Sequence, residues 1–361
     1  MKGSAITAAL KPFVESGSLA GAVTLVADKE NVLSLEAHGF ADIGSAKPMT
    51  TSALFWIASQ TKPITATAVM MLVDQGKVGL DDPVEKYLPE FKDLWLAVEK
   101  DADHALLRRP RHAITVREIL SHTSGMPFAS AMEQPTLDML TLRDAANSYA
   151  ITPLEFEPGT KYQYSNAGIN TAGRIIEVVT GMGYEEFLNV TIFGPLDMKD
   201  TCMVPSVRQV ARLAKAYKPS DDKTHLEETT ISQLHYPLTD RCRQPMPAGG
   251  LFSTARDLAK FCRMILQGGV FQDKRFLSEP AVREMSSRQT PPSLPESYGL
   301  GWSVEADSFN HGGAFSTVMT IHPRRGLITV FLLQHAGFPE GGENCRKAFV
   351  DAALATFGKT A

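Results

Sequence analysis

The sequence predicts an α+β fold in which strands from both ends of the chain form one antiparallel sheet. Near the N-terminus, the strand-like runs "AVTLVAD" and "VLSLEAHG" are separated by the polar turn "KEN". Near the C-terminus, "FSTVMTIH" and "LITVFLLQH" flank "PRRG", which is a second hairpin signal. A helical pattern lies outside each pair of strands, so we expect the two terminal helices to cover this sheet.

Each terminal helix is predicted from apolar residues that recur every three or four positions. These residues are Ile6, Leu10, Phe13 and Val14 at the start, and Cys345, Phe349, Ala353 and Phe357 at the end. The middle of the chain is helical and rich in loops, since "TAGRIIEVVTG", "EEFLNVTIF" and "ARDLAKFCRMILQGG" have helical spacing and a Gly stop. We therefore expect one catalytic unit, residues 1–361, with an α/β subdomain of about 1–78 plus 235–361. A mostly helical subdomain of about 79–234 is inserted into it.

The composition indicates a globular protein and excludes several classes of function. The chain has 361 residues, of which 43% are hydrophobic and 21% charged, with a net charge of -4. This charge and the absence of long Lys/Arg runs argue against a nucleic-acid partner. No apolar run approaches the roughly 18 residues that span a bilayer, so no membrane span is predicted.

The cysteines and the first residues bear on cofactors and compartment. Cys202, Cys242, Cys262 and Cys345 are scattered without a C-x-x-C pair, which favours buried free thiols over a zinc or redox site. No cofactor is predicted. The first segment lacks the unbroken apolar core of a signal peptide. The chain as given is therefore predicted to be cytoplasmic, or periplasmic or secreted if a leader was removed.

The segment "FWIASQTKPI" places Ser59 three residues before Lys62 in an apolar setting. The pattern S-x-x-K occurs twice in this chain, against roughly one match expected by chance. The second match, Ser220–Lys223 in "PSDDKT", contains two aspartates and is interpreted as a solvated loop. The surroundings of Ser59 differ, because an amphipathic helix follows it and ends at Gly76.

Pro63 indicates where that helix begins, because proline fits only into the first helical turn. The helix is therefore expected to start at about Ser59 or Gln60. The backbone N–H of Ser59 then lacks an intrahelical partner and can form half of an oxyanion hole. Lys62 lies on the same helical face as Ser59, and its apolar neighbours lower its pKa towards that of a usable base. The alternative is a lysine that simply points outward.

Two further motifs contain polar groups suited to catalysis. "YQYSNAG" places Tyr164 and Asn166 before a helix, as a proton carrier and a substrate-amide anchor. The alternative is a packed tyrosine and a capping asparagine. "FNHGGAFSTV" places His311 and Gly313 before Ala314, whose N–H can supply the second half of the oxyanion hole. The alternative is an ordinary surface histidine followed by a bulge.

Together, S-x-x-K, Y-S-N and H-x-G in this order resemble the serine β-lactamase and penicillin-binding serine hydrolase family. The resemblance covers about residues 20–335 and includes "LVDQGKVGLDDPVEKYLPEF", "ITVREILSHTSGMP" and "PAGGLFSTARDLAKF". Its closest likeness is to class C β-lactamases, D-alanyl-D-alanine carboxypeptidases and family VIII carboxylesterases. It implies a β-lactamase/transpeptidase-like fold.

The resemblance also implies roles for the motif residues. Ser59 would be the acylated nucleophile, Lys62 and Tyr164 the proton-handling pair, and Asn166 a substrate-binding residue. The backbone at Gly313 and Ala314 would complete the substrate site. His311 stands where many lactamases have Lys, and Ala129 where class C lactamases have a substrate-binding Gln.

These two departures weaken the interpretation as a β-lactamase, because the resemblance associates His at this position with peptidase-like and esterase-like relatives. An esterase is favoured, and a class C-type β-lactamase or a D-Ala-D-Ala carboxypeptidase is the alternative. The expected partner is thus a small ester, β-lactam or D-amino-acid peptide, and the sequence leaves the oligomeric state open. An α/β-hydrolase would need G-x-S-x-G and a zinc hydrolase H-E-x-x-H, and the chain contains neither pattern. A non-catalytic penicillin-binding sensor is the remaining alternative, although such proteins usually lose a catalytic group.

Overall fold

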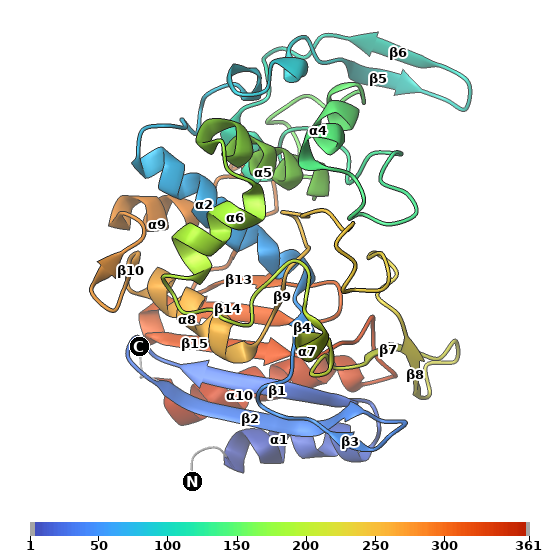
Figure 1. Cartoon of the computed structure of the whole chain (residues 1–361), viewed down its shortest axis with the longest axis vertical. Helices are drawn as coiled ribbons and strands as arrows, with labels where there is room; N and C mark the ends of the chain where they lie inside the picture. The colour runs from blue at the N-terminus through green and yellow to red at the C-terminus, as the bar shows by residue number, and fades with distance from the viewer. Residues whose placement is uncertain (1–3, 359–361) are drawn as a thin grey trace.

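A computed structural model describes residues 4–358, and its centre is a seven-stranded antiparallel sheet (Figure 1). The strand order is β12-β13-β14-β15-β1-β2-β3. The strands are β1 (Gly21–Ala27), β2 (Val32–Asp42), β3 (Lys47–Pro48), β12 (Ser303–Val304), β13 (Phe309–Gly312), β14 (Val318–His322) and β15 (Leu327–Leu332). Strands β1 and β15 pair in the middle of the sheet, with Val23 opposite Leu332. The predicted sheet built from both ends of the chain is therefore confirmed.

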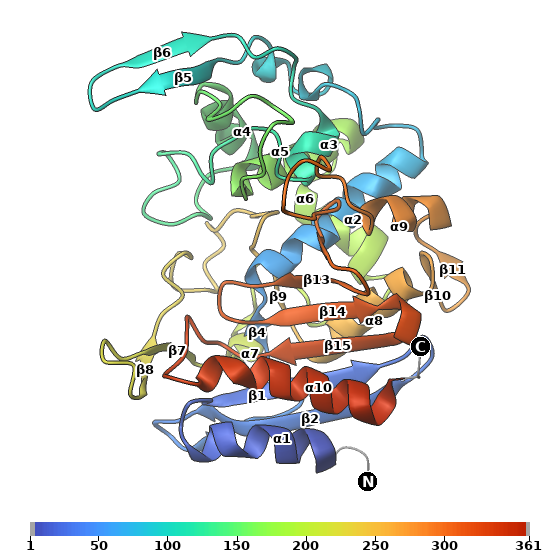
Figure 2. The same cartoon turned by 180° about the vertical axis from the view of Figure 1, so that it is seen from behind.

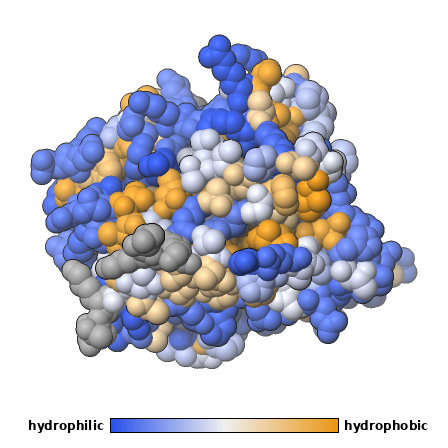
Figure 3. Space-filling model, turned by 90° about the horizontal axis from the view of Figure 1, so that it is seen from below, coloured by the Kyte–Doolittle hydropathy of each residue, from blue (hydrophilic) through white to orange (hydrophobic). Residues whose placement is uncertain are grey.

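Both faces of the sheet are covered by helices. Successive side chains of β1 point to opposite faces and are all buried, so each face needs a covering layer. Ala22 and Val26 pack with the terminal helices α1 (Ser4–Glu15) and α10 (Cys345–Phe357). Val23 and Leu25 face the other way, into the core that includes α8 (Ala255–Leu266). Figures 1 and 2 show these layers from opposite sides. The end of the molecule that carries α1 and β2 has a mostly hydrophilic surface with small, separate hydrophobic areas (Figure 3).

The helical part lies at the end of the molecule opposite α1 and α10 (Figure 1). It contains α3 (Val116–Leu120), α4 (Leu142–Ala150), α5 (Asn166–Thr180), α6 (Tyr184–Leu188) and the hairpin β5 (Leu96–Lys100) with β6 (Ala105–Arg108). Helix α2 (Thr61–Asp74) runs between this part and the sheet. Its residues from Thr61 to Leu72 are all buried, so it packs on every side rather than on the single face predicted.

The remaining elements are short. They are β4 (Phe55–Trp56), α7 (Val207–Val210), β7 (Ala216–Pro219), β8 (Leu226–Thr229), β9 (Phe252–Ser253), β10 (Val270–Phe271), β11 (Lys274–Arg275) and α9 (Glu279–Met285). The helix predicted in "EEFLNVTIF" is only partly α-helical, because α6 continues as a π-helical turn over Asn189–Phe193. Tyr217, predicted within the helical part, instead donates its N–H to the Gln334 carbonyl after β15 at 2.8 Å.

The second S-x-x-K match forms the turn between β7 and β8. Lys223 is exposed, but Ser220 is only 5% exposed, so the interpretation of the whole match as solvated was wrong. The Ser220 hydroxyl accepts the backbone N–H groups of Thr224 and His225 and donates to Asp222. These turn contacts occupy the hydroxyl, and Lys223 is not among its partners.

The four cysteines are free thiols, but the prediction that these thiols are buried holds for only two of them. Cys262 and Cys345 are buried, Cys202 is half-buried and Cys242 is exposed. Within residues 4–358, no group of three or more His, Cys, Asp or Glu side chains is placed to hold a metal ion. In the same range, no helix combines the length and the apolar composition that crossing a membrane requires.

Candidate active site

Ser59 lies in a tight turn between β4 and α2. The residues Ala58–Gln60 form a 3-10 turn, and the α-helix begins at Thr61, slightly later than predicted. Ala58 has a φ angle of 47°, a left-handed conformation that costs free energy in a residue with a side chain. The neighbouring structure holds this turn, because the Thr61 hydroxyl donates to the Ala58 carbonyl at 2.7 Å. The N–H of Ser59 has no hydrogen-bond partner among the described residues.

Lys62 is fully buried and contacts Ser59 directly. Its Nζ lies 3.1 Å from the Ser59 Oγ, 2.8 Å from the Asn166 Oδ1 and 2.8 Å from the Ala248 carbonyl oxygen. These three acceptors match the three N–H bonds of an ammonium group. Burial acts in the opposite direction and lowers the pKa of Lys62 well below 10.5. The alternative of an outward-pointing lysine is therefore wrong, and the amine is placed to exchange a proton with Ser59.

Tyr164 adjoins both Ser59 and Lys62. The Lys62 Nζ lies 4.4 Å from the centre of the Tyr164 ring. Burial raises the pKa of Tyr164 above its usual range, and a hydrogen bond with the Ser59 side chain opposes part of that rise. Tyr164 therefore rests as a neutral phenol, which can donate a proton.

Asn166 is the first residue of α5, whose N-terminus is capped by the Ser165 side chain. Its N–H donates to the Phe128 carbonyl at 2.9 Å, which fastens this end of α5 to the loop after α3. Its Oδ1 accepts from Lys62, so Asn166 orients the amine. The Asn166 Nδ2 has no partner among the described residues, which leaves it for a substrate oxygen.

His311 is not the surface histidine of the alternative interpretation, because it is only 5% exposed. Its Nδ1 lies 2.7 Å from the Gly312 carbonyl oxygen, and its Nε2 lies 2.9 Å from the hydroxyl of Tyr298. Nδ1 must therefore carry the ring proton, and Nε2 accepts from Tyr298. Burial, together with the charge of Lys62, lowers the pKa of His311 to about 3. The position that resembles the lactamase lysine is thus neutral.

Gly313 allows β13 to approach the turn before the nucleophile. A Cβ atom at Gly313 would lie 2.3 Å from the Thr317 Oγ1 and 2.5 Å from the Ile57 carbonyl oxygen. The close neighbour of Gly313 is therefore the chain itself, although the family resemblance places Gly313 in the substrate site. Gly313 donates its N–H to the Thr317 carbonyl, while the next N–H, that of Ala314, has no partner among the described residues. Ala314 and Ser59 thus leave two backbone donors free in neighbouring segments.

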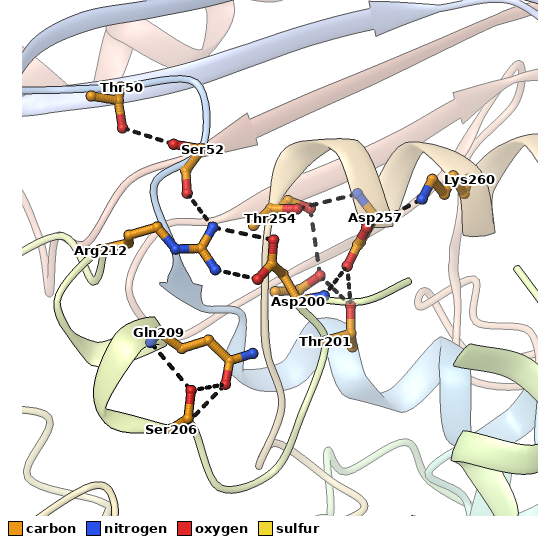
Figure 4. A network of polar contacts seen from close by, with 11 residues as sticks. Thr50, Ser52, Asp200, Thr201, Ser206, Gln209, Arg212, Thr254, Asp257 and Lys260 are labelled. Atoms are coloured by element: carbon orange, nitrogen blue, oxygen red, sulfur yellow. Dashed lines mark hydrogen bonds and ion pairs between the residues drawn. The ribbon is translucent and has the colours of Figure 1, made fainter. Parts of the chain in front are cut away.

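A polar network lies beside the segment that leads into β4 (Figure 4). Arg212 forms an ion pair with Asp200 and donates to the Ser52 carbonyl, which precedes β4. Asp200 donates its N–H to Asp257 in the first turn of α8 at 2.8 Å. These contacts connect three distant segments of the chain. They stabilise the strand that leads to Ser59.

Three groups that form part of the site were not predicted from the sequence. They are the carbonyl of Ala248, which binds Lys62, and the side chains of His122 and Tyr298, which pack around Tyr164 and His311. Ala248 itself is held by Asn170, whose Oδ1 accepts its N–H at 2.9 Å. Ala248 lies in the stretch "PAGGLFSTARDLAKF" and His122 in "ITVREILSHTSGMP", and both stretches resemble the family. This resemblance was the signal in the sequence that could have identified these two residues.

The buried histidines predict a loss of stability in acid. Burial lowers the pKa of His311 to about 3 and that of His335 to about 4, from 6.5 for an unperturbed histidine. The unfolded chain therefore binds more protons than the folded one below pH 6.5, and unfolding becomes easier until about pH 4. As the pH falls through that window, each histidine lowers the free energy of unfolding by at most about 1.4 kcal/mol per pH unit. Urea unfolding at pH 7.5, 6.0 and 5.0 checks this, and a free energy that stays constant would contradict it.

Comparisons with known proteins find similarity over nearly the whole chain. The family model described as Beta-lactamase matches residues 6–353. An uncharacterized protein of Mycobacterium tuberculosis is 30% identical over 97% of this chain and 92% of its own length. A putative D-alanyl-D-alanine carboxypeptidase of Salmonella agona is 26% identical over 78% of this chain and 69% of its own.

Two solved structures share the fold at low sequence identity. EstCE1, described as a hydrolase with promiscuous acyltransferase activity, is 23% identical and superposes with a TM-score of 0.81 over 98% of both chains. Simvastatin synthase (LovD) from Aspergillus terreus is 22% identical, with a TM-score of 0.81 over 98% of both chains. At this level of identity the likeness concerns the fold.

Proposed function

Since the chain belongs to the beta-lactamase family, we propose that it is a serine hydrolase that cleaves esters through an acyl-enzyme on Ser59. The observation that carries this proposal is the contact of Ser59 with a fully buried lysine. A lysine whose pKa is lowered by burial can activate a hydroxyl nucleophile without a histidine. Tyr164 stands next to the same hydroxyl as a neutral acid.

Acylation follows from the resting states of these three groups. Ser59 Oγ attacks the ester carbonyl, and its proton passes to the neutral amine of Lys62. The N–H groups of Ser59 and Ala314 stabilise the oxyanion of the tetrahedral intermediate. Tyr164 then donates its proton to the leaving alcohol and regains one from Lys62. The products of this step are a free alcohol and an ester on Ser59.

Deacylation uses Tyr164 and Lys62 again, now to accept a proton from water. A water molecule attacks the acyl-enzyme while Tyr164 takes a proton from the water and passes its own to Lys62. The collapse of the second tetrahedral intermediate returns a proton to Ser59 and releases the carboxylic acid. Because Tyr164 is a neutral phenol at rest, it acts here as a relay between the water and the amine.

The charge of the site supports an uncharged ester as substrate. A β-lactam carries a carboxylate that is bound best by a cation, and His311 at that position is neutral at pH 7.5 because its pKa is lowered to about 3. By the family resemblance, Ala129 stands where class C lactamases have a substrate-binding Gln, and it lacks the side-chain amide that would bind an acylamide group. The loss of one such hydrogen bond costs about 0.5–1.5 kcal/mol, or up to roughly tenfold in rate.

We therefore expect ester hydrolysis to be well ahead of β-lactam and peptide hydrolysis at pH 7.5. A parallel rate panel with p-nitrophenyl butyrate, a chromogenic cephalosporin and a D-Ala-D-Ala peptide measures this preference. Efficient cephalosporin or peptide turnover with p-nitrophenyl butyrate untouched would replace the ester assignment by a lactamase or carboxypeptidase. Stable acylation of Ser59 by penicillin without any turnover would indicate a penicillin-binding sensor.

A further inference from the structure

His122 is a buried imidazole in the loop after α3, and two of its features cost free energy. Its φ angle is 62°, in the left-handed region that few residues with a side chain adopt. Its Nε2 is buried without a hydrogen-bond partner among the described residues. A buried donor without an acceptor destabilises the folded state. Strained and unsatisfied groups of this kind cluster at functional sites.

His122 binds the chain on both sides of Tyr164. Its carbonyl oxygen accepts the N–H of Gln163 at 2.9 Å. Its Nδ1 accepts the N–H of Ser165 at 3.1 Å. Its ring also packs on the phenol, with the two ring centres 4.4 Å apart. One residue therefore holds the backbone before Tyr164, the backbone after it and its side chain.

These contacts require a neutral imidazole with its proton on Nε2. Nδ1 can accept the Ser165 N–H only while it carries no proton. Burial, and then the charges of Lys62 and His311, lower the pKa of His122 well below 6.5. The ring centre of Tyr298 lies 4.7 Å from that of His122 and encloses the imidazole further. The uncharged ring also adds no positive charge beside the amine of Lys62.

We propose that His122 is a positioning residue that holds the Tyr164 phenol against Ser59 and Lys62. It acts through hydrogen bonds that its carbonyl oxygen and its Nδ1 accept from two backbone N–H groups, and through the contact of its ring. It exchanges no proton with substrate. This inference rests on the proposed function, because Tyr164 is its target as the proton carrier of Ser59. A displacement of about 1 Å in a catalytic group can lower a rate by roughly 100-fold.

Two substitutions separate the contacts of His122. His122→Asn removes the ring, while asparagine tolerates the left-handed backbone and offers an oxygen to the Ser165 N–H. His122→Phe keeps a ring and removes the acceptor. We expect kcat for p-nitrophenyl butyrate to fall about 10- to 100-fold in each variant, with KM changed less than about threefold.

The decisive measurement combines each variant with Tyr164→Phe. If His122 acts through Tyr164, His122→Asn lowers kcat less than about twofold once the phenol is absent. Losses that multiply would show a general structural effect and would overturn the proposal, as would wild-type kcat in both single variants. His38→Asn is the matched control, because His38 is a buried histidine on β2 that bonds to Thr24. We expect it to keep wild-type kcat.

Two further measurements separate failure of this inference from failure of the proposed function or of folding. Labelling of wild-type Ser59 by a fluorophosphonate tests the proposed function alone, since it does not depend on His122. If neither variant folds, nitrogen-15 NMR of the histidines in the wild-type protein tests the inference directly. A neutral His122 protonated on Nε2 from pH 5 to 8 supports it. A proton on Nδ1 excludes the bond to Ser165 and overturns it.

Discussion

Ser59→Ala is expected to reduce ester turnover by roughly 10⁴- to 10⁶-fold, the loss typical of a nucleophile in a coupled catalytic unit. The hydroxyl is small, and Lys62 keeps two other acceptors, the oxygens of Asn166 and Ala248. The melting temperature should therefore change by only a few degrees. Initial rates with p-nitrophenyl butyrate and a thermal melt measure both effects. Intact mass spectrometry after fluorophosphonate treatment should show one adduct in the wild type and none in the variant.

Ser220→Ala is the matched control for this substitution, because it alters the other S-x-x-K serine of the chain. Ser220 is bound within the turn between β7 and β8, and its hydroxyl contacts Asp222 rather than a lysine. We expect wild-type activity and an unchanged adduct in this variant. An adduct that maps to Ser220, or a Ser59→Ala protein with wild-type rates, would refute the assignment of the nucleophile.

Lys62→Met and Tyr164→Phe are each expected to lower the rate by orders of magnitude, and their effects should not multiply. Both groups serve one proton path from Ser59 to the leaving alcohol, so the removal of either interrupts it. Methionine fills the space of the buried lysine stem, and its lack of an amine leaves Ser59 without a base. Steady-state kinetics on the two single variants and the double variant measure the coupling. A double variant slowed by the product of both losses would contradict a shared path.

Tyr217→Phe is the control for the phenol, since its hydroxyl accepts the Ile43 N–H and lies outside the site. The pH dependence provides a second check on Lys62. Its lowered pKa means that the neutral amine, and with it the rate, increases as pH rises through a range below 10.5. The raised pKa of Tyr164 keeps the phenol protonated over that range. A rate that decreases with pH there would be inconsistent with a neutral lysine base.

Local patterns in the sequence were sufficient to predict the fold class and several members of the site. Residue spacing and turn chemistry reveal the hairpins and the terminal helices, because these elements depend on neighbours within a few residues. The same holds for the helix start that Pro63 marks. Ser59 and Lys62 are three residues apart, and one helical turn brings them together whatever the remainder of the chain does. The motifs around Tyr164 and His311 were identifiable because they combine several polar residues within a short segment.

The contacts that define the site depend on packing between distant segments. Asn166 and Ala248 reach Lys62 only because α5 and the loop before β9 pack against α2, and the sequence separation gives no local signal of this. The environment of His311 could not be predicted from the sequence either, because its burial and its bond to Tyr298 follow from the tertiary structure. The sequence by itself determined which groups are present, because residue type and local spacing are encoded directly. Only the tertiary structure decided their protonation, because burial and neighbouring charges set each pKa.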